Sequence, residues 1–322
     1  MAGKTKELSW SLTKARMFDD CPRRYYYHYY MAQKYYSSDT PEDIRLASEM
    51  KPIQSLDMWA GDVVHQTIQW GFEQSRAGAL ITDEDVKADI RRRLSDGWQG
   101  SVKQLWRTNP EDAYPNLFQH YYDVPVDKTE TERIKNKAYL SVSNFIASDL
   151  YTEITRTSYD HWLPIEKYAS FRVDGLLMYV KFDFALLDSG VLTVYDWKTG
   201  KPTPEEIRQL ACYSLYASDK WNTPLSNTRA CAVHLQPEFE AEPREVKQDS
   251  IDEMRFYVKQ SFDNMVKSLR NPAQNIAAME DFPVTINMLK CLKCNFHGIC
   301  EQGKIAAEDI GDLPIVENWG EQ

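Results

Sequence analysis

The sequence predicts an α/β protein in which a mixed β-sheet is flanked by helices. Strand-type patterning begins near residue 166, and helix-type segments lie before, within and after the strand-rich part. The 322 residues are 43% hydrophobic, which is enough to bury one large core or two modest ones without crosslinks. No internal repeat or low-complexity tract is present, so we expect one core with additions at both ends.

The first half of the chain is expected to be mainly helical. Val64, Ile68 and Phe72 recur at four-residue spacing and mark the apolar stripe of an amphipathic helix. The expected helices cover about residues 58–76, 84–106 and 130–150. The second and third of these carry no recognisable motif, and they are expected to form a helical insertion.

The second half changes to strand-type patterning. Three segments rich in β-branched and aromatic residues are expected strands: IEKYASFRV, LMYVKFDFALL and VLTVYDWK. Asp188-Ser189-Gly190 predicts a hairpin between the last two, and Asp174 is also expected in a turn. Thr203-Pro204-Glu205-Glu206 is a favourable helix start, with proline and acidic residues in the first turn. A strand over about 230–236 and a helix over about 250–270 complete the expected core.

Strand parity predicts which side chains of this hairpin meet. Side chains alternate between the two faces of a strand, so Asp196 and Lys198 project side by side. On the preceding strand Asp183 is expected opposite Phe182 and Phe184, and the hairpin can bring it close to Asp196. Two converging carboxylates suit Mg or Mn, and a neighbouring lysine can steer water or stabilise phosphate charge.

The six cysteines fall into two groups. Cys212 and Cys231 lie in apolar-patterned stretches and are expected to be packing residues. The other four are one near the N-terminus and a C-x2-C-x5-C set near the C-terminus: Cys21, Cys291, Cys294 and Cys300. Four thiolates can hold structural zinc or an iron–sulfur cluster, and the spacing alone does not separate the two.

The charge pattern limits the classes of partner. A net charge of −10 argues against a protein that coats nucleic acid by bulk electrostatics. Local basic contacts are expected at two places, the segment CPRRYYYHYY with Lys14 and Arg16 before it, and the run Arg91–Arg93. Arginine beside tyrosine is typical of single-strand binders, and half-buried tyrosine packing is the alternative. With no secretory signal and no bilayer-spanning apolar run, we expect a cytoplasmic protein without membrane contact.

The order of these residues along the chain is the most specific feature of the sequence. An aspartate on one strand, D-x-K on the next and a following helix with Gln209 and Tyr213 resemble the RecB-type branch of the PD-(D/E)XK nuclease superfamily. His65 in GDVVHQTIQ resembles the helix-borne histidine of that branch, and Gln209-x3-Tyr213 resembles its Q-x3-Y motif. Cys21-Pro22 with CLKCNFHGIC resembles the cluster of AddB and of iron–sulfur exonucleases linked to CRISPR adaptation or replication.

This resemblance implies a restriction-endonuclease-like core that cleaves DNA with Mg or Mn. The implied metal ligands are Asp183, Asp196 and His65. Lys198 would polarise or position the attacking water, and Gln209 and Tyr213 would support the lysine or the path of the strand. The resemblance also implies a [4Fe-4S] cluster, with structural zinc as the alternative, that staples the N- and C-terminal segments together through four ligands: Cys21, Cys291, Cys294 and Cys300.

One position departs from the family pattern. The family often has a small residue two positions before the first metal aspartate, and this chain has Lys181 there. Lys181 can contact a phosphate or pair with a carboxylate such as Glu166, and we expect the pairing.

We expect four regions and one principal function. The regions are 1–57 with the first cluster cysteine, 58–160 as a helical region with the histidine motif, 161–270 as the nuclease core, and 271–322 as the iron–sulfur segment with an acidic tail. The expected function is a metal-dependent DNA nuclease, an exonuclease acting on single-stranded or end-bearing DNA in recombination, repair or defence. A helicase or a recombination or defence protein is the expected partner. The alternative is a non-cleaving DNA-binding or scaffolding subunit of a helicase or recombination complex.

Overall fold

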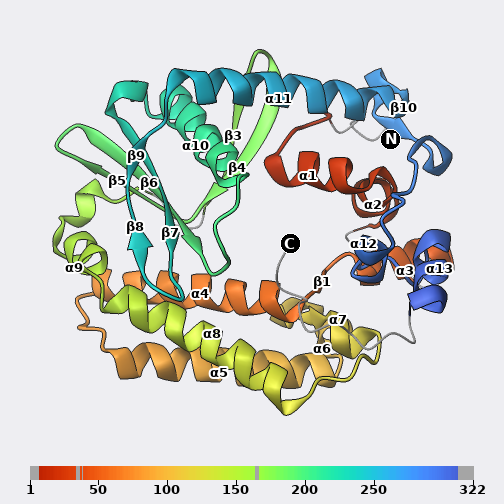
Figure 1. Cartoon of the computed structure of the whole chain (residues 1–322), viewed down its shortest axis with the longest axis horizontal. Coiled ribbons are helices and arrows are strands. Elements are labelled where there is room, and N and C mark those ends of the chain that lie inside the picture. Colours follow the sequence, from red (N-terminus) through yellow and green to blue (C-terminus); the bar gives the residue numbers. More distant parts are fainter. Residues whose placement is uncertain (1–6, 34–36, 38, 164–166, 311–322) are drawn as a thin grey trace. The chain divides into compact units, whose positions relative to one another are not determined.

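The computed structural model describes residues 7–33, 37, 39–163 and 167–310 (Figure 1). The chain divides into two compact units. Unit 1 draws on Met1–Ile53, Arg172–Tyr179 and Arg255–Trp319, and unit 2 draws on Gln54–Phe171 and Val180–Met254. Glu166 and the acidic tail lie outside the described residues.

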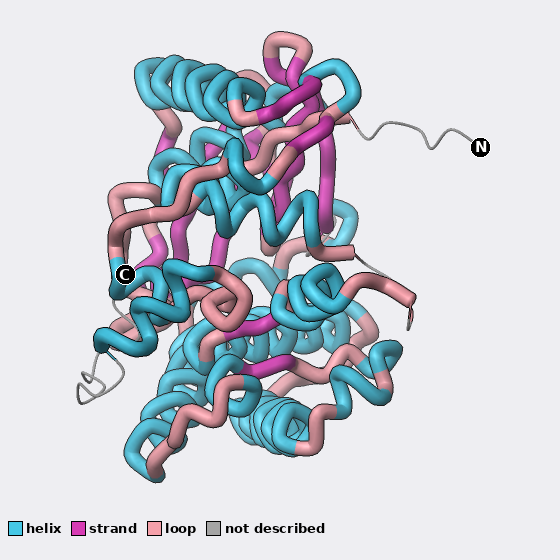
Figure 2. Tube along the Cα trace, turned by 90° about the vertical axis from the view of Figure 1, so that its right-hand side faces the viewer, coloured by secondary structure: helices cyan, strands magenta, loops and turns pink. Residues whose placement is uncertain are grey.

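Unit 2 is built on a mixed sheet, as the sequence predicts. Its strands are β5 (Phe184–Asp188), β6 (Val191–Lys198), β7 (Thr228–His234), β8 (Glu240–Ala241) and β9 (Arg244–Glu245). The order is β5-β6-β7-β8, and β9 also pairs with β7. Strands β6 and β7 are parallel, whereas the β5–β6, β7–β8 and β7–β9 pairs are antiparallel. Figure 2 colours all strands of the chain magenta and its helices cyan.

The predicted hairpin between β5 and β6 is confirmed. Asp188 pairs with Val191, so the loop consists of Ser189 and Gly190 alone. Both loop residues have positive φ, 50° and 78°, which is the backbone of a type I′ turn. Asp174 and Gly175 make a similar turn between β3 (Lys167–Val173) and β4 (Leu176–Phe182), with φ values of 49° and 85°.

Helices cover the sheet of unit 2. Helix α10 (Glu206–Lys220) connects β6 to β7 and packs on both strands. Helices α4 (Leu56–Arg76), α5 (Asp83–Val102) and α8 (Lys128–Ile146) pack on one another (Figure 1). Their aromatic side chains meet those of the sheet: the rings of Phe72 and Phe184 lie 4.9 Å apart, and those of Phe145 and Trp197 4.8 Å apart. This layer buries the side of β6 that faces away from α10.

Two of the predicted helices are each divided in two. The helix predicted over 84–106 ends at Val102, because Gln104 takes a left-handed φ of 53° before the short helix α6 (Leu105–Thr108). The helix predicted over 130–150 ends at Ile146, because the Ser148 side chain accepts a hydrogen bond from the backbone N–H of Tyr151 and caps a new helix, α9 (Asp149–Arg156). The remaining short elements of unit 2 include β2 (Asn116–Leu117) and α7 (Phe118–Tyr121).

The predicted strand LMYVKFDFALL is also divided, and this corrects the predicted faces. Asp183 separates β4 from β5. The Phe182 ring packs on Tyr213 and Trp221 at helix α10, whereas the Phe184 ring packs on Phe72 of α4. Phe182 and Phe184 therefore lie on opposite sides of the sheet and not on one face, because strand alternation stops where the ladder is interrupted.

Unit 1 is mostly helical. Its elements are α1 (Leu12–Asp20), α2 (Pro22–Tyr26), the π-helix η1 (Tyr27–Met31), α3 (Glu42–Met50), part of α11 (Gln248–Lys267), β10 (Leu269–Asn271), β11 (Ile276–Ala277), α12 (Met288–Leu292) and α13 (Glu301–Ile310). The tyrosine-rich segment forms much of its core, with Tyr25 and Tyr27 buried and their rings against Phe282 and Phe296. Among the described helices of the chain, none has the length and hydropathy needed to cross a membrane.

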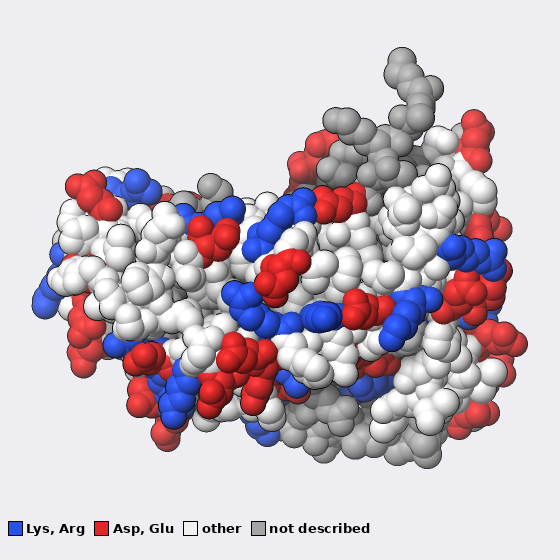
Figure 3. Space-filling model, turned by 90° about the horizontal axis from the view of Figure 1, so that it is seen from above, with Lys and Arg blue, Asp and Glu red and all other residues white. Residues whose placement is uncertain are grey.

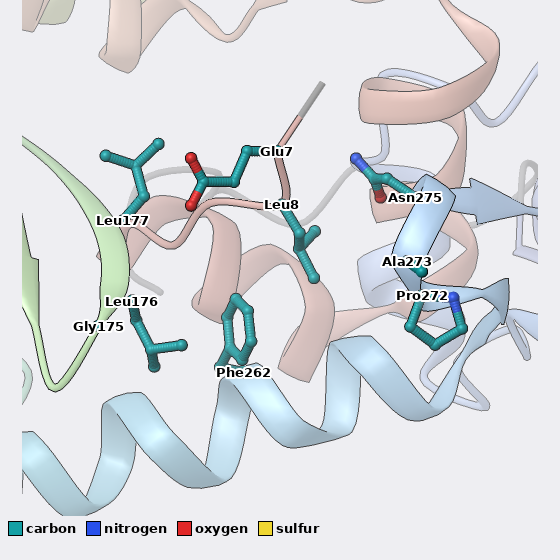
Figure 4. Close-up of a pocket in the computed structure, with 9 residues that line it drawn as sticks. All are labelled: Glu7, Leu8, Gly175, Leu176, Leu177, Phe262, Pro272, Ala273 and Asn275. Carbon is teal, nitrogen blue, oxygen red and sulfur yellow. The ribbon is translucent and has the colours of Figure 1, made fainter. Parts of the chain in front are cut away.

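A cavity of about 380 Å³ opens in unit 1 (Figure 4). Leu8, Leu176, Phe262 and Pro272 form its apolar lining, and Asn275 lies at one end. The Glu7 carboxylate also lines the cavity and is held in an ion pair by Arg172, with 2.9 Å between the guanidinium and the carboxylate oxygen. Its surface is therefore mixed, with both polar and apolar parts.

Candidate active site

A polar network centred on Asp196 lies between β6 and α10. The Asp196 carboxylate is buried, and its Oδ1 atom is 2.7 Å from the Tyr213 hydroxyl and 3.0 Å from Gln209 Nε2, which donates to it. Its Oδ2 atom forms an ion pair with the Lys198 ammonium. The ammonium also donates to Gln209 Oε1 over 2.8 Å. Four predicted site residues are thus joined in one network.

Local sequence explains why these four meet. Asp196 and Lys198 are two residues apart on β6 and share the face toward α10, whereas Tyr195 and Trp197 stack with each other on the other face. Gln209 and Tyr213 are four residues apart on α10 and therefore lie on one side of that helix. The Gln209 amide also donates to the Tyr213 hydroxyl over 2.7 Å, which aligns the two side chains.

The Tyr213 hydroxyl is a permanent donor in this network. Burial raises its pKa well above the ordinary value, and the Asp196 and Asp183 carboxylates raise it further. The hydroxyl lies 3.0 Å from the Lys181 carbonyl oxygen as well as near Asp196. A neutral phenol is the only form that can donate to a carboxylate, so the raised pKa keeps this hydrogen bond in place across the biochemical pH range.

Asp183 and His65 form a second polar group next to the same strand. Asp183 follows β4, and its Oδ2 accepts a 2.7 Å hydrogen bond from the backbone N–H of Trp197. His65 comes from α4: its Nδ1 is 3.3 Å from Asp183 Oδ1, and its Nε2 is 3.1 Å from the Trp197 carbonyl oxygen. Both imidazole nitrogens thus face oxygen atoms, and a neutral imidazole can donate to only one of them. A proton or a metal ion at the other nitrogen would make the second nitrogen–oxygen contact favourable.

The carboxylate and imidazole groups of this site are ligands that suit a hard divalent cation. They do not, however, converge on a single point. Asp196 Oδ2 is buried, and its contact among the described residues is the ion pair with the Lys198 ammonium. A carboxylate oxygen is a ligand that Mg and Mn prefer, but the ammonium already engages this one. Within the described ranges, however, no three His, Cys, Asp or Glu side chains converge as a ready metal site. Binding a cation would therefore require these side chains to rearrange.

One histidine–carboxylate contact beside this network was missed by sequence reasoning. His234 on β7 pairs in register with Lys198, and its Nε2 is 3.2 Å from the Glu206 carboxylate at the start of α10. Glu206 lies three residues before Gln209, on the same side of the helix. The register of the two parallel strands decides this contact. The local sequence HLQPE, which begins at His234, does not predict it.

Other predicted polar residues have different partners. Arg92 and Arg93 of the predicted basic run form ion pairs with the buried Asp89, at 2.6 and 2.5 Å. Lys181 contributes its carbonyl oxygen to the Tyr213 hydroxyl, and the expected pairing with Glu166 concerns a residue outside the described ranges.

The four cysteines of the proposed cluster lie near one another in unit 1. Cys21 joins α1 to α2, Cys291 is on α12, and Cys294 and Cys300 follow it. Burial raises the pKa of the Cys291 thiol, and the neighbouring Cys21 and Cys300 raise it further. Burial likewise raises the pKa of Cys294 to about 11, while Arg24 opposes the shift. The thiols are thus close enough to influence one another, but they are not arranged as a ready metal site in the described part of the chain.

The two remaining cysteines are packing residues, as predicted. Cys212 on α10 and Cys231 on β7 are buried.

Comparisons with known proteins show the family of this chain. The model of the PD-(D/E)XK nuclease superfamily matches residues 9–301. Among curated proteins, none matches the chain. A crystal structure from Eubacterium rectale, named "Putative exonuclease", is 12% identical, covers 73% of this chain and 86% of its own, and has a TM-score of 0.32. A TM-score of this size supports no conclusion, whereas the family match spans most of the sequence. This chain belongs to the PD-(D/E)XK nuclease superfamily.

Proposed function

We propose that this protein is a Mg- or Mn-dependent deoxyribonuclease, an exonuclease that acts on single-stranded or end-bearing DNA. The observation that carries the proposal is the buried Asp196 carboxylate, held by Lys198, Gln209 and Tyr213 beside the Asp183–His65 pair. Membership of a nuclease superfamily supports phosphodiester hydrolysis as the reaction.

Each side chain has a distinct role in this proposal. Asp183 and Asp196 would hold the divalent cation, with His65 as an additional ligand, because carboxylate oxygens are the ligands such cations prefer. When bound, the cation lowers the pKa of a water molecule and stabilises charge on the phosphate oxygens. Gln209 and Tyr213 keep the Asp196 carboxylate in one orientation through hydrogen bonds of 3.0 and 2.7 Å. The Lys198 ammonium would position the attacking water and stabilise phosphate charge.

The experiment that tests the site compares Asp196→Ala with Asp188→Ala. Both remove a carboxylate from the same sheet, but Asp188 ends β5 with its side chain 54% exposed, whereas Asp196 is buried in the network. With Mg or Mn and labelled single-stranded, duplex or end-blocked DNA, Asp196→Ala should cut roughly a thousandfold more slowly or worse, a barrier increase of about 4 kcal/mol. Asp188→Ala should cut at the wild-type rate.

DNA binding is measured in the same buffer without divalent ions. Comparison of binding with cleavage distinguishes a nuclease from a non-cleaving scaffolding subunit. We expect Asp196→Ala to bind DNA as the wild type does. Cleavage that persists in this variant, or that needs no divalent ion, would remove the assigned active site. A wild-type protein that binds DNA and never cuts it would favour the scaffolding subunit instead.

We further propose that Cys21, Cys291, Cys294 and Cys300 hold a [4Fe-4S] cluster, with structural zinc as the alternative. Support comes from the mutual influence of their thiols and from their origin at the two ends of the chain. Metal binding requires deprotonated thiols, so the ligand thiolates would replace the neutral forms that the raised pKa values favour. Closing so long a loop would contribute folding free energy.

Anaerobic preparation tests the cluster. We expect brown protein with iron and acid-labile sulfide, and both should be lost together with thermal stability in Cys294→Ser. The matched control is Cys212→Ala, which alters a buried cysteine of α10 and should keep the colour. Stoichiometric zinc without iron would replace the cluster assignment, and an unchanged cluster in Cys21→Ser would refute ligation from both ends.

The setting of the activity is also a proposal. We propose a cytoplasmic enzyme that works with a helicase or with a recombination or defence protein, in line with the resemblance of its cysteine pattern to CRISPR-linked and AddB-type nucleases. Co-purification of such a partner with the tagged full chain would support this setting, and a fully active monomer without any partner would argue against it.

A further inference from the structure

The contact between His234 and Glu206 lies beside the candidate active site and has no role in the function proposed above. His234 is the last residue of β7 and pairs in register with Lys198, the last residue of β6. The backbone N–H of Leu235 donates to the Lys198 carbonyl oxygen over 2.9 Å, which extends the pairing by one residue. The two strands are parallel, so their carboxyl ends, where open α/β sheets commonly bind ligands, lie at one edge.

His234 faces the same side of the sheet as Lys198. Paired residues of adjacent strands project to one side, and successive residues of a strand project to opposite sides. The preceding residue, Val233, lies in the same buried apolar cluster as Trp197, on the other side of the sheet. His234 Nε2 is 3.2 Å from the Glu206 carboxylate of α10, so the imidazole faces that helix. The ammonium of Lys198 and the imidazole of His234 are therefore neighbours on one face, and both belong to unit 2.

Glu206 fixes the chemical form of this imidazole. A carboxylate only accepts hydrogen bonds, so a neutral imidazole that faces it through Nε2 carries its proton there and keeps a lone pair on Nδ1. The Nδ1 atom of His234 is buried and has no hydrogen-bond partner in the part of the chain that the structure describes. Most buried polar atoms have a partner, so an unpaired acceptor at this position needs an explanation.

The Lys198 ammonium has a hydrogen-bond donor to spare. An ammonium carries three N–H groups. Its partners among the described residues are the Asp196 carboxylate and the Gln209 amide oxygen, the latter at 2.8 Å. Adjacent strands lie about 4.8 Å apart, so this ammonium and the unpaired acceptor of His234 extend from neighbouring backbone positions.

A divalent cation at Asp196 would displace the ammonium from that carboxylate. Two cations at one carboxylate oxygen repel each other, so Lys198 has to leave Asp196 Oδ2 before the site can fill. The lysine is half-buried, and an ammonium that lacks partners is costly in such surroundings. The site therefore needs a second acceptor within reach of the end of β6, and His234 Nδ1 is such an acceptor.

The His234–Glu206 contact differs from the charge pairs on the surface. On the face that Figure 3 shows, lysine and arginine side chains lie interspersed with aspartate and glutamate, where water can be the partner of either. The side chains of His234 and Glu206 are only 12% and 15% exposed. Bulk water does not reach Nδ1, because protein atoms cover it. A donor from the protein itself is therefore the partner that suits this nitrogen.

We propose that His234 Nδ1 receives the Lys198 ammonium when a divalent cation displaces it from Asp196. His234 and Glu206 are then positioning residues for Lys198, and Glu206 acts by holding the proton on Nε2. The ammonium stays at the carboxyl edge of β6 and β7 instead of turning into solvent. The role of the cation rests on the proposed function, whereas the unpaired acceptor beside Lys198 is a feature of the fold.

The test is the affinity of the full chain for Mn without DNA, measured by electron paramagnetic resonance of the free ion. His234→Gln keeps a donor for Glu206 near the position of Nε2 and removes the Nδ1 acceptor. Its dissociation constant for Mn should rise about tenfold, the change that corresponds to one hydrogen bond to a charged group. His234→Asn places an amide oxygen near the position of Nδ1, so it should bind Mn more tightly than His234→Gln does.

A double-mutant cycle assigns the effect to the lysine. Lys198→Met has no ammonium to move, so adding His234→Gln to it should leave its Mn affinity unchanged. The matched control in the wild-type background is His161→Gln. His161 Nδ1 lies 3.2 Å from the carboxylate of the exposed Asp188, on the same sheet but outside the network, and its loss should not change Mn affinity.

Nitrogen NMR of histidine-labelled protein tests the role of Glu206. The spectrum of His234, identified by its loss in His234→Gln, should show the proton on Nε2 in the wild type. Glu206→Leu removes the only group that selects this form, so both forms should then be populated, and Mn should bind more weakly than to the wild type.

Three results would overturn the proposal. The first is equal Mn affinity in His234→Gln and the wild type. The second is an equal loss of affinity in the Lys198→Met background, which would indicate that His234 acts on the cation without the lysine. The third is a wild-type His234 with its proton on Nδ1. A wild type that binds no Mn would refute the proposed function and this inference together, whereas normal Mn binding in His234→Gln would refute this inference alone.

Discussion

Tyr213→Phe tests whether the α10 network holds the Asp196 carboxylate. The substitution removes one oxygen atom and keeps the ring that packs on Phe182. The hydroxyl is buried and lies 2.7 Å from Asp196 Oδ1 and 3.0 Å from the Lys181 carbonyl. After substitution Asp196 Oδ1 keeps, among the described residues, the 3.0 Å hydrogen bond from Gln209.

The expected magnitudes follow from these contacts. A hydrogen bond to a charged group contributes about 1.5–3 kcal/mol, so the free energy of unfolding should fall by about that amount. If the carboxylate must keep one orientation to hold a cation, kcat should fall about ten- to hundredfold, since each tenfold step corresponds to about 1.4 kcal/mol in the barrier. Gln209→Ala should also lower both the free energy of unfolding and kcat.

The assays are urea denaturation and cleavage of labelled DNA with Mg or Mn. Tyr216→Phe is the matched control: it lies on the same helix, and its ring packs on Phe171 and Trp221. It should change stability by no more than about 0.5 kcal/mol and leave cleavage unchanged. Unchanged stability together with unchanged cleavage in Tyr213→Phe would refute the inferred role of the hydroxyl.

Three further predictions concern other parts of the chain. His65→Ala should raise the concentration of Mn needed for half-maximal cleavage, and an unchanged metal titration would exclude His65 as a ligand. Asp89→Ala should cost about 3–5 kcal/mol in urea denaturation, because it leaves Arg93 and Thr67 without a buried partner, whereas the exposed Asp96→Ala should change little. Wild-type stability should fall as pH drops from the ordinary histidine pKa of 6.5 toward about 3, because the unfolded chain binds a proton that buried His28 does not, and His28→Gln should show a smaller fall. Parallel pH curves for the two proteins would contradict this assignment.

Much of the candidate active site follows from local rules that the sequence carries. Alternation along β6 places Asp196 and Lys198 on one face, and helical periodicity places Gln209 and Tyr213 on one side of α10. The turn at Ser189 and Gly190 is local as well, since positive φ at both positions selects a two-residue hairpin. These features depend on neighbours within a few residues, so no knowledge of the fold is needed to predict them.

The division of the predicted strand at Asp183 is a different case. The pattern LMYVKFDFALL reads as one strand, and its alternation would place Phe182 and Phe184 together. In the structure the Asp183 side chain accepts from the Trp197 backbone N–H, and the two phenylalanines pack on opposite layers. Which layer lies on each side of the sheet is decided by helices far away in the chain, so the local pattern could not reveal the break.

The sequence by itself determined the α/β class, the hairpin, the order of the motif residues and the buried state of Cys212 and Cys231, because hydrophobic periodicity and turn chemistry act over short distances. Only the tertiary structure decided that His65 meets Asp183, a contact across more than a hundred residues, and that Lys14 and Lys51 share one aromatic ring. Such contacts exist because packing of the cores brings remote backbone segments together. The free energy of this packing comes from many apolar side chains and not from the polar residues that meet.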